Sequence, residues 1–214
     1  MVVDSLSREN EGDLILAAED MTTEKMAFMI RHTSGLICAP LSSALCSSLE
    51  LPQMVSSADN ADPNRTAYTV SVDADHPDTT TGISAHDRAL TCRLLAAPEA
   101  EASDFRRPGH IFPLRARDGG VRRRKGHTEA AVEFCRLAGK RQASVISEIV
   151  DDGAEVPGVA ERWGAGMLRR GGCLEFGKRW GLSVCTIEDL VAHVEGKEKV
   201  HNGYNETNRK ENTL

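Results

Sequence analysis

Residues 126–150 have the sequence GHTEAAVEFCRLAGKRQASVISEIV, and this stretch decides the fold. Its first half repeats apolar side chains at helical spacing up to Gly139, namely Ala131, Phe134, Cys135 and Ala138. Its second half, from Ala143 to Val150, is apolar on both faces, which is typical of an interior strand. A helix followed by a buried strand indicates a sheet whose faces are covered by helices.

The rest of the chain continues this alternation of strands and helices. The clearest strand is Ala67 to Ala74, where apolar and polar residues alternate, so we expect one apolar and one polar face. Shorter strands are predicted at residues 1–4, 14–18, 36–39, 111–116 and 182–187. Helices are predicted from Thr22 or Thr23 to about Ser34, from Ser84 to about Ala96 and from Leu174 to Trp180. The expected fold class is α+β, a single domain with a mixed β-sheet covered by helices in a layered arrangement.

Size, charge and cysteine usage limit the function classes. A chain of 214 residues fits one domain, which we expect to span residues 1–194, with the polar residues 195–214 as a disordered tail. A net charge of −6 and 4% aromatic residues argue against a nucleic-acid partner, which would need clustered positive charge. Six cysteines without a CxxC pair predict free thiols, and no segment is apolar for the roughly 18 residues of a membrane helix. We therefore expect a cytoplasmic protein without a membrane partner.

The first candidate site is the run Arg8-Glu9-Asn10-Glu11-Gly12-Asp13, directly before the apolar strand at residues 14–18. A solvated surface loop is one explanation for such a charge run. However, carboxylate-rich loops are also how proteins hold Mg²⁺, which prefers oxygen ligands and keeps waters that a substrate can replace. Arg8 would then orient an anionic or hydroxylated ligand.

The second candidate is Arg124-Lys125-Gly126-His127-Thr128 at the start of the predicted helix. Free backbone N–H groups and the helix dipole make such a start an anion site that suits phosphate. Arg124 offers a fork of donors, Gly126 permits close approach of the backbone, and Thr128 adds a hydroxyl. His127 either turns toward a metal or makes an ordinary hydrogen bond at the helix start.

Two further residues are candidates for acid–base chemistry. Glu148 lies within the apolar strand from Ala143 to Val150, and a buried carboxylate is one way in which proteins prepare a general acid or base. A structural hydrogen bond or ion pair would explain it equally well. His110 lies where a turn enters the strand at residues 111–116, and alone it would be weak support for a site.

Four segments together resemble one known family. They are residues 8–14 (RENEGDL), 81–85 (TGISA), 108–114 (PGHIFPL) and 126–130 (GHTEA). In this order and spacing they are similar to 3,4-dihydroxy-2-butanone 4-phosphate synthase, in its stand-alone, fungal-like form. The similarity extends from Val2 to about Val194, and chance agreement of four such motifs is very improbable.

The resemblance implies that D-ribulose 5-phosphate is converted to L-3,4-dihydroxy-2-butanone 4-phosphate and formate, with Mg²⁺ (or Mn²⁺ in its place) and no organic cofactor. It implies metal ligands at Glu9 and His127 and catalytic roles for His110, Glu148 and Asp13. The substrate-binding positions that it implies are Arg8, Glu9, Asp13, Thr81, Arg124, Gly126, His127, Thr128 and Glu148. It also implies a homodimer with sites at the interface.

The chain departs from the family pattern at two places, and two rival functions compete with the one that the resemblance implies. Family members begin with a helix before the strand that Val2 and Val3 end, and the connection from Asp151 to Cys173 is of the longer, fungal kind. One rival function is a non-catalytic nucleotide- or RNA-binding module that would use the basic run Arg122 to Lys125. The other is a different metal-dependent phosphosugar lyase or isomerase, which would not release formate.

Overall fold

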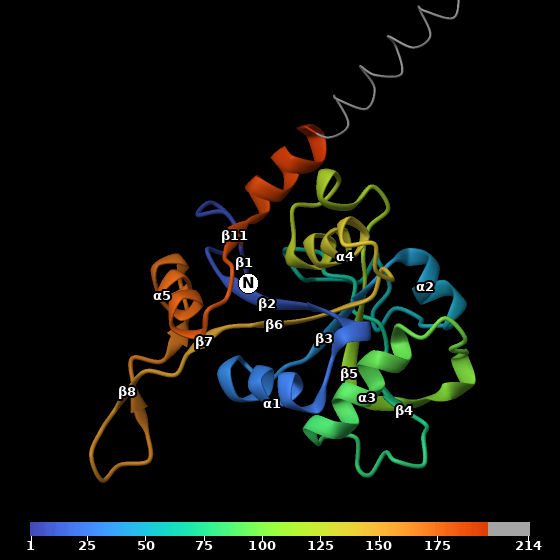
Figure 1. Ribbon diagram of the computed structural model, residues 1–214, viewed down its shortest axis with the longest axis horizontal. Coiled ribbons are helices and arrows are strands. Elements are labelled where there is room, and N and C mark those ends of the chain that lie inside the picture. The colour runs from blue at the N-terminus through green and yellow to red at the C-terminus, as the bar shows by residue number, and fades with distance from the viewer. Residues whose placement is uncertain (197–214) are drawn as a thin grey trace, which may run out of the picture.

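A seven-stranded mixed sheet forms the centre of the computed structural model, which describes residues 1–196 (Figure 1). Its strands follow the order β11 (Cys185–Thr186), β1 (Val2–Val3), β2 (Gly12–Ala17), β6 (Ser144–Glu148), β3 (Cys38–Leu41), β5 (Phe105–Arg115) and β4 (Val72–Ala74). The pairs β1–β11 and β3–β5 are parallel, and the other pairs are antiparallel. The single-domain α+β prediction is confirmed.

Helices cover both faces of this sheet, as Figure 1 shows. Helices α1 (Thr23–His32) and α3 (Ala85–Leu95) pack on one face, where Leu14, Ala39 and Val145 belong to the largest apolar cluster. Helix α4 (His127–Leu137) covers the other face, where its Ala131 packs with Cys38 of β3 and Ile146 of β6. β6 is thus buried from both sides, as its apolar sequence predicts.

The helix starts follow the expected capping chemistry. The Thr22 hydroxyl accepts a hydrogen bond from the Lys25 amide at the start of α1, and the Ser84 hydroxyl accepts one from the Asp87 amide at α3. Helix α2 (Ser43–Ser48), which Ser42 caps, was not predicted from the sequence, and neither were three short 3-10 turns. Those turns are η1 (Ala18–Asp20), η2 (Ala102–Asp104) and η3 (Gly120–Arg122).

The strand predicted before Pro40 is shifted, because β3 runs through this proline to Leu41. Proline lacks the N–H that a central strand needs. β3 pairs with β6 at Cys38, and Leu41 bridges Ala143, so that the ladder toward this neighbour is interrupted at Pro40. Pro40, which has no N–H to donate, therefore lies where β3 makes no ladder pair with β6.

The prediction of one long alternating strand from Ala67 to Ala74 is wrong, because the strand is shorter and its polar residues are buried. Only Val72–Ala74 forms β4, and Tyr68 and Thr69 make isolated bridges. The polar residues are buried, because the Thr69 hydroxyl donates to the Pro113 carbonyl and the Ser71 hydroxyl accepts from the Gly109 amide. β5 is correspondingly longer than expected, since it begins at Phe105.

The last third of the described chain differs most from expectation. Residues 150–167 form two small two-stranded sheets, β7 (Val150–Asp151) with β10 (Gly166–Met167) and β8 (Ala154–Glu155) with β9 (Arg162–Trp163). The hairpin of β8 and β9 extends away from the main sheet (Figure 1). α5 spans Arg170–Trp180, four residues longer at its start than predicted, and a further helix covers residues 187–196. The tail predicted for residues 195–214 lies, from 197 onward, outside the described residues.

Candidate active site

The acidic loop between β1 and β2 is organised by one buried carboxylate, Asp4. Its oxygens accept hydrogen bonds from the amides of Glu9 (3.1 Å) and Glu11 (2.9 Å) and from Nη1 of Arg8 (2.8 Å). Burial alone would raise the pKa of Asp4, but the Glu11 amide and the Arg8 guanidinium hold it below its usual value. The loop is therefore a built structure and not a solvated charge run.

Glu9 projects from this loop and is held at both carboxylate oxygens. Arg8 donates to one oxygen and the Nδ2 of Asn64 to the other. Partial burial raises the pKa of Glu9, Arg8 opposes that rise, and the neighbouring Asp4 and Glu11 add to it. A cation beside Glu9 would favour its charged form.

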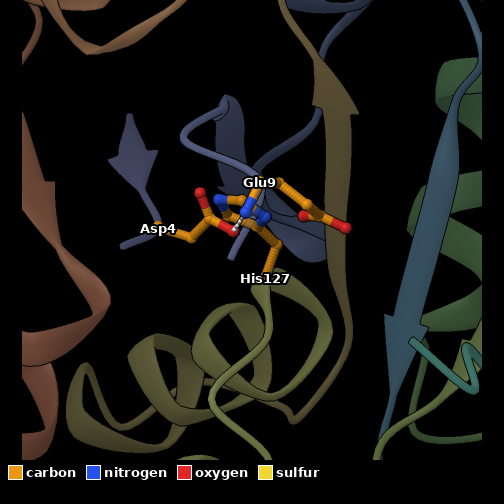
Figure 2. Close-up of side chains that lie close together, drawn as sticks. All are labelled: Asp4, Glu9 and His127. Carbon is orange, nitrogen blue, oxygen red and sulfur yellow. Dashed lines mark hydrogen bonds between the residues drawn. The ribbon is translucent and has the colours of Figure 1, made fainter. Parts of the chain in front are cut away.

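His127 is the first residue of α4, and its ring rises from the helix start toward Asp4 and Glu9 (Figure 2). One potential ligand atom from each of these three residues lies within 4.8 Å of the others. Burial lowers the pKa of His127, which favours the neutral ring that metals require. Its Nε2 is buried and has no hydrogen-bond partner among residues 1–196.

Asp13 and Glu148 face each other across the β2–β6 pair. Burial raises the pKa of Asp13 well above its usual value, and the nearby Glu148 and Glu9 add to that rise. Its Oδ1 lies 3.6 Å from Nδ1 of His127 and has no hydrogen-bond partner within the described part of the chain. Glu148 is half-buried at the end of β6, so the expectation of full burial is wrong, although the strand before it is buried.

The predicted anion site at the start of α4 has the expected backbone but a different arginine geometry. Gly126 is the N-cap, and a Cβ there would lie 2.2 Å from Nη1 of Arg124, so a larger residue would displace this guanidinium. All three guanidinium nitrogens of Arg124 are engaged, with the Asn64 carbonyl, the Glu129 carboxylate and the Thr66 hydroxyl. Thr128 is buried in the first turn.

His110 belongs to a second group, on β5. Asp73 accepts hydrogen bonds from its backbone amide (2.8 Å) and from its Nδ1 (2.7 Å). A carboxylate oxygen facing Nδ1 favours the tautomer with its proton on Nδ1, and Nε2 is then the base nitrogen of the neutral ring. Gly82, with φ of +92°, packs against this pair, since a Cβ there would lie 2.0 Å from the Asp73 carboxylate. Thr81 is exposed beside it.

The strand register relates the two groups. Cys38 of β3 pairs with Phe112 of β5 and with Ile146 of β6. His110 lies two residues before Phe112 and Glu148 two residues after Ile146, so both lie toward the start of β3, separated by two strand spacings of roughly 5 Å each. The fold thus gathers Arg8, Glu9, Asp13, His127 and Glu148 into one cluster and places His110 with Thr81 beside it.

Comparison with known proteins shows the family to which this chain belongs. The family model of 3,4-dihydroxy-2-butanone 4-phosphate synthase matches residues 1–193. The chain belongs to this family. Its members act in riboflavin biosynthesis, and this chain is one of these synthases.

Individual relatives of this family cover most of the chain. The 3,4-dihydroxy-2-butanone 4-phosphate synthase of Pyricularia oryzae is 69% identical over 92% of this chain and 84% of its own length. The riboflavin biosynthesis protein RibBA of Nocardia farcinica is 52% identical over 93% of this chain but only 45% of its own length. A crystal structure of a 3,4-dihydroxy-2-butanone 4-phosphate synthase in complex with two magnesium ions, 69% identical, superposes with a TM-score of 0.90 over 92% of this chain and 90% of that one.

Four residues that shape the site of this synthase were not predicted from the sequence. Asp4 organises the acidic loop, Asn64 holds Glu9, and Asp73 orients His110. The carboxylate of Asp87 accepts from Thr80 and Gly82 and so fixes the loop that carries Thr81. An acid within a polar strand face or after a two-residue strand gives no sequence signal that distinguishes it from a surface residue.

Proposed function

We propose that the cluster around Glu9, His127, Asp13 and Glu148 converts D-ribulose 5-phosphate to L-3,4-dihydroxy-2-butanone 4-phosphate and formate, with the assistance of Mg²⁺. The observation that carries this proposal is the convergence of a carboxylate loop, a neutral histidine and a helix start on one point. Such a convergence provides oxygen and nitrogen ligands for a metal next to donors for a phosphate.

The residues present fit a divalent ion. Glu9 offers a carboxylate, and His127 offers a buried Nε2 without a partner in the described chain. Asp4, by contrast, is already used by three donors, so we assign the ligands to Glu9 and His127. When bound, the ion would hold adjacent substrate oxygens and stabilise the negative charge of an enediolate. Mn²⁺ is expected to substitute, and no organic cofactor is required.

The substrate phosphate is assigned to the start of α4. The amides of the first turn point out of the helix, Gly126 keeps the approach open, and Thr128 adds a hydroxyl. Arg124 supports this position from behind, because its guanidinium joins the Asn64 carbonyl to Glu129 of the same helix. Arg8, which contacts Glu9, and the exposed Thr81 complete the substrate contacts that we propose.

Three groups are available to move protons during enolisation, dehydration and formate release. Burial raises the pKa of Asp13, which suits a group that gives a proton to a substrate oxygen. Glu148 lies opposite Asp13 and is accessible from the site, which suits removal of a proton from carbon. His110 presents a free Nε2, because Asp73 holds its Nδ1 proton.

A single assay tests the proposed reaction. Purified protein should release formate from D-ribulose 5-phosphate, and chelation of divalent metal should stop this release. Consumption of ribulose 5-phosphate without formate would indicate a different phosphosugar lyase or isomerase. Absence of any turnover, together with tight binding of a nucleotide or RNA, would favour the non-catalytic module.

We also propose a homodimer with the sites at its interface. Two apolar side chains next to the site are exposed, Leu36 (39%) before β3 and Ile83 (52%) beside the Thr81 loop. A mixture of the inactive variants His110→Ala and Glu148→Gln tests whether both subunits contribute to one site. Recovery of about a quarter of the activity on mixing is expected for a shared site, and no recovery would place each site within one subunit.

The proposed location is the cytoplasm. The six cysteines are free thiols, which suits a reducing compartment. Among residues 1–196, no helix has the length and apolarity needed to cross a membrane. Fluorescence microscopy of the tagged protein in its host tests the assignment, and a signal confined to an organelle would refute it.

A further inference from the structure

A cavity of about 740 Å³ rich in arginine lies outside the catalytic cluster. Arg65, Arg115, Arg117 and Arg123 line it, and Asp118 is the one carboxylate among its lining residues. The remaining lining residues are polar or small: Ser43, Gln53, Ser57, Asn60, Ala67 and Ala116. Its volume is within the range of small-molecule sites. Four guanidinium groups around one space create a strongly positive potential in a chain whose net charge is −6.

Within residues 1–196, none of these four arginines forms an ion pair with a carboxylate. Arg65 and Arg117 donate to backbone carbonyls, and Arg115 donates to Ser43 and Ser47. The Nε of Arg115 is buried without a hydrogen-bond partner in the part of the chain that the structure describes. The carboxylate of Asp118 accepts from the Ser43 hydroxyl. Four guanidinium groups against the single carboxylate of Asp118 leave the described lining with an excess of positive charge, which favours an anionic ligand.

The cavity is separate from the catalytic cluster. Arg115 pairs with Leu41 at the end of β3, whereas Glu148 and His110 lie toward its beginning. Neither Glu9 nor His127 lines the cavity.

Two structural elements nevertheless connect the cavity to the catalytic cluster. Glu129 of α4 accepts from the Arg117 amide with one oxygen and from Arg124 with the other. The loop at residues 64–65 contacts both the catalytic cluster and the cavity. Asn64 holds Glu9, and the next residue, Arg65, lines the cavity. A ligand that draws Arg65 or Arg117 toward itself therefore pulls on the contacts that fix Glu9.

We propose that this cavity is a second, regulatory anion site that binds a phosphorylated small molecule and changes turnover at the catalytic cluster. The forked donors of the arginines match the oxygens of a phosphate, and the remaining volume accommodates an attached sugar or nucleoside. The basic run at residues 122–125 contributes through Arg123 to this site, and not to a nucleic-acid surface.

Isothermal titration calorimetry tests the binding, with inorganic phosphate and adenosine 5′-monophosphate as probes. The intact protein is titrated in EDTA, at an ionic strength held constant because exposed charges are screened by salt. We expect one molecule of adenosine 5′-monophosphate per chain. The double variant Arg117→Gln/Arg123→Gln should lower the affinity for adenosine 5′-monophosphate by about tenfold or more, since the variant lacks two charge-assisted donors. The double variant Arg31→Gln/Lys178→Gln carries the same charge change on exposed residues elsewhere and should bind as the wild type does.

Formate release at saturating ribulose 5-phosphate and constant Mg²⁺ tests the regulation. Adenosine 5′-monophosphate should change the wild-type rate by about fivefold, a typical coupling, and should leave the rate of Arg117→Gln/Arg123→Gln unchanged. Equal binding of adenosine 5′-monophosphate to the wild type and this variant would overturn the proposal. So would a change in rate that excess substrate abolishes and that this variant still shows, because the mononucleotide would then act at the catalytic cluster. Tighter binding of a single-stranded RNA oligonucleotide than of the mononucleotide would also overturn it. The calorimetric result does not depend on the catalytic assignment.

Discussion

Asp73→Asn is the sharpest test of how His110 acts, because it changes one atom next to the ring. In the wild type, Asp73 Oδ1 accepts the His110 amide and Oδ2 accepts the Nδ1 proton. An asparagine can still accept the amide, but its NH₂ group faces Nδ1 and can only donate. The ring must then carry its proton on Nε2, and the free base nitrogen is lost.

The size of the effect follows from the contact. A hydrogen bond to a charged group contributes about 1.5–3 kcal/mol, and each 1.4 kcal/mol changes a rate by about tenfold. His110 is 41% exposed, so water weakens the interaction and the lower part of this range applies. We therefore expect kcat for formate release to fall by about 10- to 30-fold, with a smaller change in KM.

Asp75→Asn provides the matched control, since Asp75 is 62% exposed and its ion pair with Arg106 measures 3.6 Å. It should leave kcat within about twofold of the wild type. A long-range ¹H–¹⁵N spectrum should show the His110 proton moving from Nδ1 to Nε2 in Asp73→Asn only. Wild-type kcat in Asp73→Asn, or a loss of kcat without a change of tautomer, would refute the reasoning.

Four further predictions concern the rest of the site. Glu9→Gln and His127→Ala should each abolish high-affinity Mg²⁺ binding measured by calorimetry, and binding unchanged in both would show the ligand assignment to be wrong. Glu148→Gln should lower kcat by about 10²- to 10⁴-fold with the thermal midpoint preserved, and unchanged deuterium exchange at the enolised carbon in D₂O would remove Glu148 from the mechanism. Hydrogen bonds from Thr80 and Gly82 outweigh burial and lower the pKa of Asp87 in the folded protein. Ionised Asp87 therefore stabilises the fold fully above its unfolded-state pKa, and this contribution to the free energy of unfolding is lost as pH falls below about 4. Denaturant unfolding should therefore show a shallower acid decline in Asp87→Asn than in the wild type, and equal slopes would contradict this. Arg124→Ala should raise KM for ribulose 5-phosphate, and an unchanged KM would argue against its placement behind the phosphate.

Elements whose pattern is local were predictable from the sequence. α1 and α3 begin where Thr22 and Ser84 indicate, because a capping hydroxyl and its amide are only three residues apart. The buried strand β6 follows from an uninterrupted apolar run. By contrast, the polar face at Ser71 and Asp73 is buried by β5, a partner distant in sequence, and alternation alone cannot reveal that. The glycines at the start of α5 likewise hid its first turn, since Gly171 and Gly172 have low helix propensity.

The candidate site shows the same division. The carboxylate loop and the start of α4 are compact motifs, so Glu9 and His127 were identified as separate clusters, but only the fold places their ligand atoms together. Asn64 could not be found, because its role exists only through a contact with Glu9, 55 residues away. Residues that hold other residues in place leave no spacing pattern of their own.

Arg124 illustrates why a correct residue can have an unexpected role. The sequence places a forked donor before a helix start, which predicts direct contact with a phosphate. In the fold, the Arg124 guanidinium donates hydrogen bonds to the Asn64 carbonyl, the Thr66 hydroxyl and the Glu129 carboxylate. Its donors and its charge are therefore largely satisfied within the protein. In the proposed site, the phosphate is therefore held by the helix-start amides, which Arg124 supports. Arg124 also fixes the loop position of Asn64, which in turn holds Glu9. The same arginine therefore links the proposed metal site to the proposed anion site, and loss of either function on its removal would reflect a displaced loop as much as a lost contact.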